Sequence, residues 1–158
     1  SGIDVTVRAN LPTSFGQFDF SLSHTHVFDH SITLLPGDPS IDKLAYDSGY
    51  DIPRDKSTAS ITWTLDKFKA TVEGTRLGKL PNYDQDAYIP ASYLYNATLQ
   101  YDFTDHLRGS FSVVNLLDSN PVKDPTYASY PYYDISWFDS VGRSFYFQLT
   151  YKLGGGAL

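Results

Sequence analysis

The chain has 158 residues and a net charge of −6, with no basic run or stripe, which argues against nucleic-acid binding and against electrostatic docking on anionic lipid. Charged residues make up only 19%, below the roughly 25% of ordinary globular domains. Because the sequence has no cysteine, it has no disulfide framework, no thiol chemistry and no cysteine-ligated metal. It also contains no methionine and begins at Ser1, so we expect a processed or excised product.

The first predicted element is a hairpin with a tight turn. Apolar residues alternate with polar ones along residues 2–10 and again along 17–23, with a short turn at 11–16. Alternation with a period of two predicts strands that are apolar on one face. Residues 29–56 show no sustained period and contain several Asp and Pro, so we expect a long loop there.

Two further hairpins follow the same plan. The alternation predicts strands at 57–65 and 68–77, joined by Asp66 and Lys67, and strands at 93–103 and 107–117, joined by 104–106. Long loops are expected at 78–92 and 118–142, which contain Pro, Asp and Asn but no sustained period.

The final predicted strand, residues 145–153, has the clearest alternation. Its polar face carries Gln148, Thr150 and Lys152. Its apolar face consists of Phe145, Phe147, Leu149, Tyr151 and Leu153. Such a strand fits a soluble sheet, and it also fits a strand with lipid on one side and a watery lumen on the other.

The connections decide between these alternatives. They alternate short and long along about seven strands of 8–11 residues, as in transmembrane barrels with short periplasmic turns and long extracellular loops. We therefore predict an all-β fold, an antiparallel transmembrane β-barrel segment. A closed bacterial single-chain barrel has an even number of strands, so the odd count predicts part of a larger barrel.

Several motifs occur in a familiar order. Residues 90–97 read Pro-Ala-Ser-Tyr-Leu-Tyr-Asn-Ala, residues 115–118 read Asn-Leu-Leu-Asp with Pro121 after them, and Gly142-Arg143 precedes the final strand. Together they resemble the C-terminal part of a TonB-dependent outer-membrane receptor. The resemblance implies that residues 1–153 are about the last seven strands of a 22-stranded barrel, with Phe145, Phe147, Leu149, Tyr151 and Leu153 on the strand that closes it.

The resemblance also implies function and location. Such receptors lie in the bacterial outer membrane and take up a scarce nutrient, a siderophore or other metal chelate or an oligosaccharide, energised by the TonB complex through a plug. The expected partners are the rest of the barrel and plug, outer-membrane lipid and the transported ligand. The chain departs from the family where Leu153 replaces a terminal aromatic residue and a flexible Gly-rich tail, 154–158, follows.

An aromatic loop supplies the candidate ligand-binding residues. Exposed aromatic side chains stack on sugars and planar ligands, although loop self-packing or an aromatic girdle at the membrane rim is an equal alternative. Arg143 is expected to pair with a loop carboxylate such as Asp139 or to face an anionic ligand. The candidates are Tyr127, Tyr130, Tyr132, Tyr133, Trp137 and Arg143.

Two histidines are weak candidates for a metal site. His24 and His26 point the same way on a strand, and neutral imidazoles at this spacing can hold a transition metal. We favour histidines at the outer rim of the barrel, and assign no metal and no cofactor. Because they are in phase with Phe18, Phe20 and Leu22, they would face lipid unless a β-bulge or a rising strand intervenes.

Other functions find less support. An acidic loop with Asp38, Asp42, Asp47, Asp51 and Asp55 matches no EF-hand spacing, so we favour a solvated loop over a Ca²⁺ site. No catalytic motif is present, and we predict no catalytic residue and no enzyme. The alternatives are a self-contained eight-stranded outer-membrane barrel, as an adhesin or small pore, and a soluble ligand-binding β-barrel.

Overall fold

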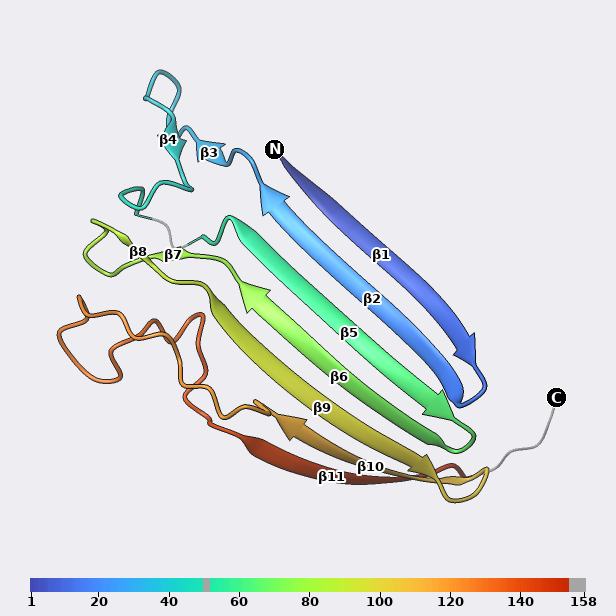
Figure 1. Ribbon diagram of the computed structural model, residues 1–158. Coiled ribbons are helices and arrows are strands. Elements are labelled where there is room, and N and C mark those ends of the chain that lie inside the picture. The colour runs from blue at the N-terminus through green and yellow to red at the C-terminus, as the bar shows by residue number, and fades with distance from the viewer. Residues whose placement is uncertain (50–51, 154–158) are drawn as a thin grey trace.

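The computed structural model describes residues 1–49 and 52–153. Its main feature is one antiparallel sheet of seven strands in the order β1-β2-β5-β6-β9-β10-β11, as Figure 1 shows. The strands are β1 (Gly2–Thr13), β2 (Gly16–Val27), β5 (Asp55–Leu65), β6 (Phe68–Leu77), β9 (Ser92–Asp102), β10 (Leu107–Val114) and β11 (Ser144–Tyr151). The predicted all-β class and seven antiparallel strands are therefore confirmed.

The sheet is open rather than closed. Over the part of the chain that the structure describes, β1 pairs only with β2 and β11 only with β10. Every neighbouring pair is antiparallel, so β1 and β11, six steps apart, run in the same direction. Closing this sheet on itself would need a parallel pair. A complete barrel is thus not formed by the described residues.

The connections are sorted by length between the two ends of the sheet. Tight turns join β1 to β2, β5 to β6 and β9 to β10 at one end, and long loops lie at the other (Figure 1). At the first turn Gly16 has φ +117°, and an added Cβ would lie 2.6 Å from the carbonyl oxygen of Thr64. Only glycine fits such a position without strain.

Four strands of two residues lie in the long loops, outside the main sheet. They form two ladders, β3 (Ser31–Ile32) with β4 (Ile41–Asp42) and β7 (Leu80–Pro81) with β8 (Tyr88–Ile89). The sequence pattern predicts loops at these places and misses both ladders, because two-residue strands are too short to show alternation. No helix in the described ranges is long and apolar enough to cross a membrane.

Several strand boundaries differ from the prediction: β1 runs on to Thr13 and β2 to Val27, past the expected ends at 10 and 23. β5 begins at Asp55, two residues early, because Asp55 still pairs with His26 of β2. β10 ends at Val114 and not at residue 117, because Asn115 takes a left-handed φ of 55°. β11 ends at Tyr151 and not at Leu153, because its partner β10 starts at Leu107. The predicted Gly-rich tail, 154–158, lies outside the described residues.

The buried core sits among the long loops and not against the sheet. Leu77, Leu80 and Ile89 are buried together, and Val122 and Phe138 of the third long loop pack on them. Among the described residues the buried hydrophobic side chains are Leu44, Leu77, Leu80, Ile89 and Tyr133. Four of the five lie outside the seven-stranded sheet, and the fifth is the last residue of β6.

Candidate functional site

One face of the sheet, called here the apolar face, is almost entirely hydrocarbon. Paired residues of an antiparallel ladder share a face, so the strand registers define its members. They are Ile3, Val5, Val7, Ala9 and Leu11; Phe18, Phe20 and Leu22; Ala59, Ile61, Trp63 and Leu65; Phe68, Ala70, Val72 and Gly74; Tyr93, Tyr95, Ala97, Leu99 and Tyr101; Leu107, Gly109, Phe111 and Val113; and Phe145, Phe147, Leu149 and Tyr151.

No described segment covers the apolar face. Phe20 of β2 is 41% exposed, Val72 of β6 is 43% exposed and Phe147 of β11 is 70% exposed. These side chains come from an inner, a central and an edge strand, so the exposure extends across the sheet. A sheet face of this composition is stable in water only under a second layer.

The opposite face, called here the polar face, is built from hydroxyls, amides and charges. Cross-strand pairs form a ladder of hydroxyl hydrogen bonds, with Thr62 Oγ1 2.9 Å from Thr71 Oγ1 and Thr98 Oγ1 3.0 Å from Ser112 Oγ. At the β1–β2 edge the Asn10 side chain donates to the Asp19 carboxylate. These groups bond to one another across the strands and remain at least partly exposed.

Aromatic side chains gather at the turn end of the apolar face. Trp63 and Phe68 meet edge to face with ring centroids 5.6 Å apart, and Tyr101 and Phe103 do so at 5.1 Å. The indole N–H of Trp63 donates to the carbonyl of Phe15 at 2.9 Å. Trp and Tyr are the residues that prefer the boundary between hydrocarbon and water, since each has an apolar body and a polar tip.

Polar side chains interrupt the apolar face at its loop end, where β2 ends and β5 begins. The predicted candidates His24 and His26 face Ser57 and Asp55 across the two strands. One of the two ways to resolve the phase conflict, a β-bulge, is not found: the ladder between β1 and β2 is unbroken from Gly2 to Val27. The histidines therefore lie on the apolar face, at its loop end.

A cavity lies under the third long loop, on the polar side of the sheet. Its volume is about 350 Å³, and Trp137 and Phe138 form its apolar wall. Polar groups of Lys56, Asn115 and Asp139 also line it. A pocket with mostly apolar walls and a few polar groups is the usual form of a small-molecule site, so this cavity is the best-formed candidate for ligand capture.

The predicted ligand-binding aromatics do not form one cluster. Trp137 lines the cavity, whereas Tyr133 is buried with its ring against Phe138, at a centroid distance of 6.3 Å. Tyr127 packs on Tyr83 of the second long loop at 4.7 Å. Tyr130 and Tyr132 contact each other edge to face, and Tyr130 is 82% exposed.

Arg143 pairs with a loop carboxylate, as expected, but the partner is Asp118 and not Asp139. Its Nη2 lies 3.6 Å from the Asp118 carboxylate, and its backbone N–H donates to the same side chain at 3.0 Å. Asp139 instead accepts from the backbone N–H of Val141. The Asp118 pair closes the base of the third long loop. Arg143 therefore has a structural partner, and it is not among the residues that line the cavity.

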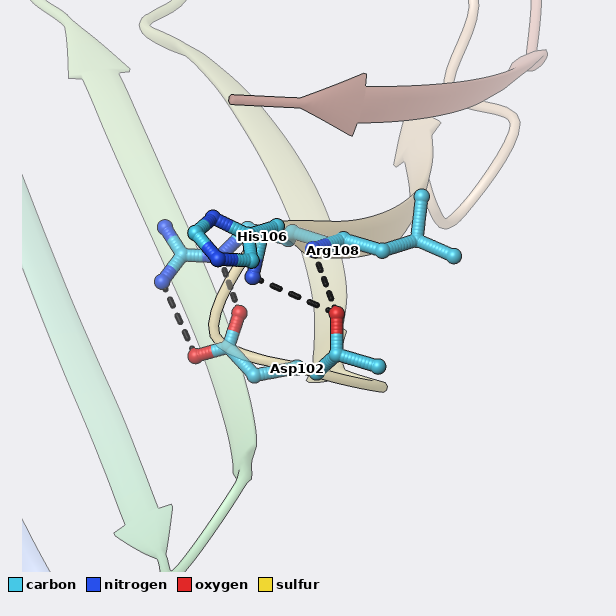
Figure 2. A network of polar contacts seen from close by, with 5 residues as sticks. Asp102, His106 and Arg108 are labelled. Atoms are coloured by element: carbon cyan, nitrogen blue, oxygen red, sulfur yellow. Dashed lines mark hydrogen bonds and ion pairs between the residues drawn. The ribbon is translucent and has the colours of Figure 1, made fainter. Parts of the chain in front are cut away.

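The turn between β9 and β10 holds a compact polar network, shown in Figure 2. The guanidinium of Arg108 donates two hydrogen bonds to the carboxylate of Asp102. The bond from Nη2 to Oδ2 is 2.9 Å long. Thr104 Oγ1 accepts from the backbone N–H groups of His106 and Leu107. Both sets of bonds serve the turn. His106 takes part through its backbone N–H.

The sequence analysis missed Lys56, Asn115 and Asp55 as site residues. Lys56 and Asn115 line the cavity only because the third loop folds back over the sheet, and no local pattern predicts that. Asp55 was counted with the acidic loop. Its place could have been found by aligning the apolar residues of β5 with those of β2, which sets Asp55 opposite His26.

Comparisons of the chain with family models, with curated proteins and with solved structures found no match.

Proposed function

We propose that the seven-stranded sheet is part of a transmembrane β-barrel, with its apolar face against lipid and its polar face toward the lumen. The observation that carries this proposal is the uncovered apolar face, which spans all seven strands. Strands of 8–12 residues approximate the ~9–11 residues of a tilted membrane-spanning strand. Lipid supplies the apolar layer that the described chain does not.

Exposed apolar surface supplies the energetic support for this proposal. A monomeric soluble protein rarely exposes a contiguous apolar patch above a few hundred Å², and a single aromatic residue can bury ~150–250 Å². The apolar face carries Phe18, Phe20, Phe68, Phe111, Phe145 and Phe147 besides its Trp, Tyr and aliphatic residues. Such a surface in water drives association, whereas in a bilayer the same side chains are solvated by lipid tails.

The open edges of the sheet support the proposal that it is part of a larger barrel. Unpaired backbone groups on a strand edge cost several kcal/mol each in hydrocarbon, so both β1 and β11 need neighbours. They run parallel to one another, so an all-antiparallel barrel needs an odd number of further strands between them. The described part of the loop 28–54 supplies only β3 and β4, which pair with each other, so an eighth strand from this chain has little support.

The more specific proposal is that the barrel belongs to a TonB-dependent receptor of the bacterial outer membrane. Its support is the order of motifs at residues 90–97, 115–118 and 142–143 followed by the strand β11. In that role the long loops face outward and capture a metal chelate or an oligosaccharide. The cavity beside Trp137 and Phe138 is the place where such a ligand first meets the chain.

The soluble ligand-binding barrel has no observation in its favour, because a soluble barrel directs its apolar face inward and this face is uncovered. The test is the behaviour of the isolated chain in detergent micelles. Our proposal expects no compact, heat-resistant monomer on a semi-native gel, because the open edges lack partners. A folded, heat-modifiable monomer of this chain alone contradicts the shared-barrel proposal, and a monodisperse monomer without detergent contradicts the membrane proposal.

A further inference from the structure

We propose that His24, His26 and Asp55 bind a divalent first-row transition metal ion, with Zn²⁺ as the test ion, at the loop end of the apolar face. One nitrogen of each imidazole and one oxygen of the carboxylate all lie within 4.8 Å of one another. Among the described residues this is the only group of three such side chains placed closely enough to hold a metal ion. The site is independent of the loop cavity and of the transport proposal.

Strand geometry places the three side chains together. His24 and His26 lie two residues apart on β2, so both project from the same face. Their rings are nearly parallel, at an interplanar angle of 24° and a centroid distance of 6.4 Å. Asp55 is directly opposite His26 in the ladder. Two positions on one strand and one on its neighbour give three donors fixed by backbone pairing.

The distances require a small closing movement. Bonds of ~2.0–2.2 Å from zinc to nitrogen or oxygen put tetrahedral donor atoms roughly 3.3 Å apart, closer than the 4.8 Å limit within which these atoms lie. The side chains of His26 and Asp55 are 31% and 27% exposed. Partly exposed side chains rotate about χ1 and χ2 without disturbing a core, so the donors can converge while the strands stay paired.

Hydrogen bonds already hold the imidazoles in place. His24 Nδ1 lies 2.8 Å from Ser57 Oγ, and His26 Nδ1 lies 2.5 Å from Asp55 Oδ1. A hydrogen bond from one ring nitrogen to an oxygen orients the other nitrogen and raises its basicity, as is usual for metal-ligating histidines. Ser57 therefore acts as a positioning residue for His24. Asp55 holds the His26 ring in the ion-free chain, and this hydrogen bond opens when the ring nitrogen and the carboxylate both bind the ion.

The donor set selects the class of ion. Two imidazoles and one carboxylate suit Zn²⁺, Ni²⁺ or Cu²⁺, whereas Ca²⁺ and Mg²⁺ prefer sites made of oxygen alone. Binding requires neutral imidazoles and releases any proton they carry. Three protein ligands leave a position for water. An ion here would connect the last residues of β2 to the first residue of β5, and so fasten both ends of the loop between them.

A plain ion pair is the competing interpretation. The contact between His26 and Asp55 is accounted for by hydrogen bonding alone, and such a pair needs no metal. It does not involve His24, which bonds to Ser57. The two interpretations therefore differ in what happens when His24 is changed, and this difference decides the experiment.

The experiment is calorimetric titration with ZnCl₂, and with CaCl₂ as the second probe, of the chain assembled with the strands that complete its barrel in lipid vesicles, where β2 and β5 are paired. The chain has four histidines, so His30→Ala and His106→Ala are matched controls for His24→Gln and His26→Gln. We expect about one Zn²⁺ per chain, no Ca²⁺ binding, and a loss of at least about tenfold in affinity for His24→Gln, for His26→Gln and for Asp55→Asn. Ser57→Ala should weaken binding less than His24→Gln.

Any of three titration results overturns the proposal: no measurable Zn²⁺ binding, binding that His24→Gln leaves unchanged, or an equal loss in the His30→Ala or His106→Ala control. X-ray absorption at the zinc edge gives a second readout that does not depend on variants. It should show two imidazole nitrogens among the ligands. A shell of oxygen donors alone also overturns the proposal.

Discussion

Asp124 in the third long loop accepts a hydrogen bond from the backbone N–H of Tyr83 in the second, with its Oδ2 2.6 Å from that nitrogen. The carboxylate is 1% exposed, and its other oxygen accepts from the backbone N–H and the hydroxyl of Thr126. One buried side chain thus ties the two loops that stand beside the cavity. The ring of Tyr83 also packs on that of Tyr127, and the loop core adds apolar contacts between the same two loops, so the two loops form one assembly.

Replacing Asp124 by Ala should loosen both loops, because it removes the acceptor of two part-buried backbone N–H groups, at a cost of about 1 kcal/mol each. The measurement is hydrogen exchange at the backbone amides of Tyr83 and Thr126, which should lose protection together. The matched control is Asp139→Ala, since Asp139 accepts from the backbone N–H of nearby Val141, within the same loop. Equal loss of protection in both variants would show that Asp124 is not the link.

Charge introduced on the two faces of β5 should have opposite consequences. Ile61 lies on the apolar face between Phe20 and Val72, and its neighbour Ser60 lies on the polar face opposite Glu73. In a bilayer Ile61→Arg should destabilise the assembled barrel by about 2–4 kcal/mol, while Ser60→Arg gains an ion-pair partner and is tolerated. Urea titration in lipid vesicles measures the difference.

The same pair of variants separates the membrane proposal from a soluble sheet. If the apolar face is exposed to water, Ile61→Arg should raise solubility and leave the free energy of unfolding nearly unchanged, because a charge is well hydrated there. The proposal therefore fails if Ile61→Arg and Ser60→Arg have indistinguishable midpoints in urea.

The small loop core should depend on Leu80. This side chain is 2% exposed and packs with Leu77 and Ile89, so Leu80→Ala leaves a cavity at a typical cost of about 2–5 kcal/mol. Because this core lies beside the sheet and not within it, the loss should appear as local opening of the loop 78–91. Limited proteolysis should cut that loop faster. Leu117→Ala, at a site 63% exposed, should change nothing.

The strands were predictable from the sequence because alternation is a local property. A period of two over eight or more residues assigns each side chain of β6 or β9 to one of the two faces of the sheet, without any knowledge of neighbouring strands. The predicted strand boundaries were wrong where something other than hydrophobic alternation ends the strand. β10 stops at Asn115 because its side chain bonds the backbone of Ser119 in both directions and holds a left-handed turn.

The candidate sites were less predictable because they join residues from distant parts of the chain. His24 and His26 were found from their spacing, but Asp55 comes from the far side of a long loop, and only the pairing of β2 with β5 brings it near. In the same way the contact between Tyr83 and Asp124 joins two different loops. Composition indicates that such loops are polar and aromatic, and it contains no information on which residues meet.

The most direct test of the central claim, that the apolar face contacts lipid, is the environment of single spin labels in reconstituted membranes. The chain has no native cysteine, so Ile61→Cys and Ser60→Cys each carry one label, on the apolar and the polar face. In the assembled barrel in lipid vesicles, we predict that oxygen, which concentrates in hydrocarbon, relaxes the label at position 61, and that a water-soluble nickel chelate relaxes the label at position 60. Strong relaxation of both labels by the nickel chelate, with no difference between the faces, would contradict the account.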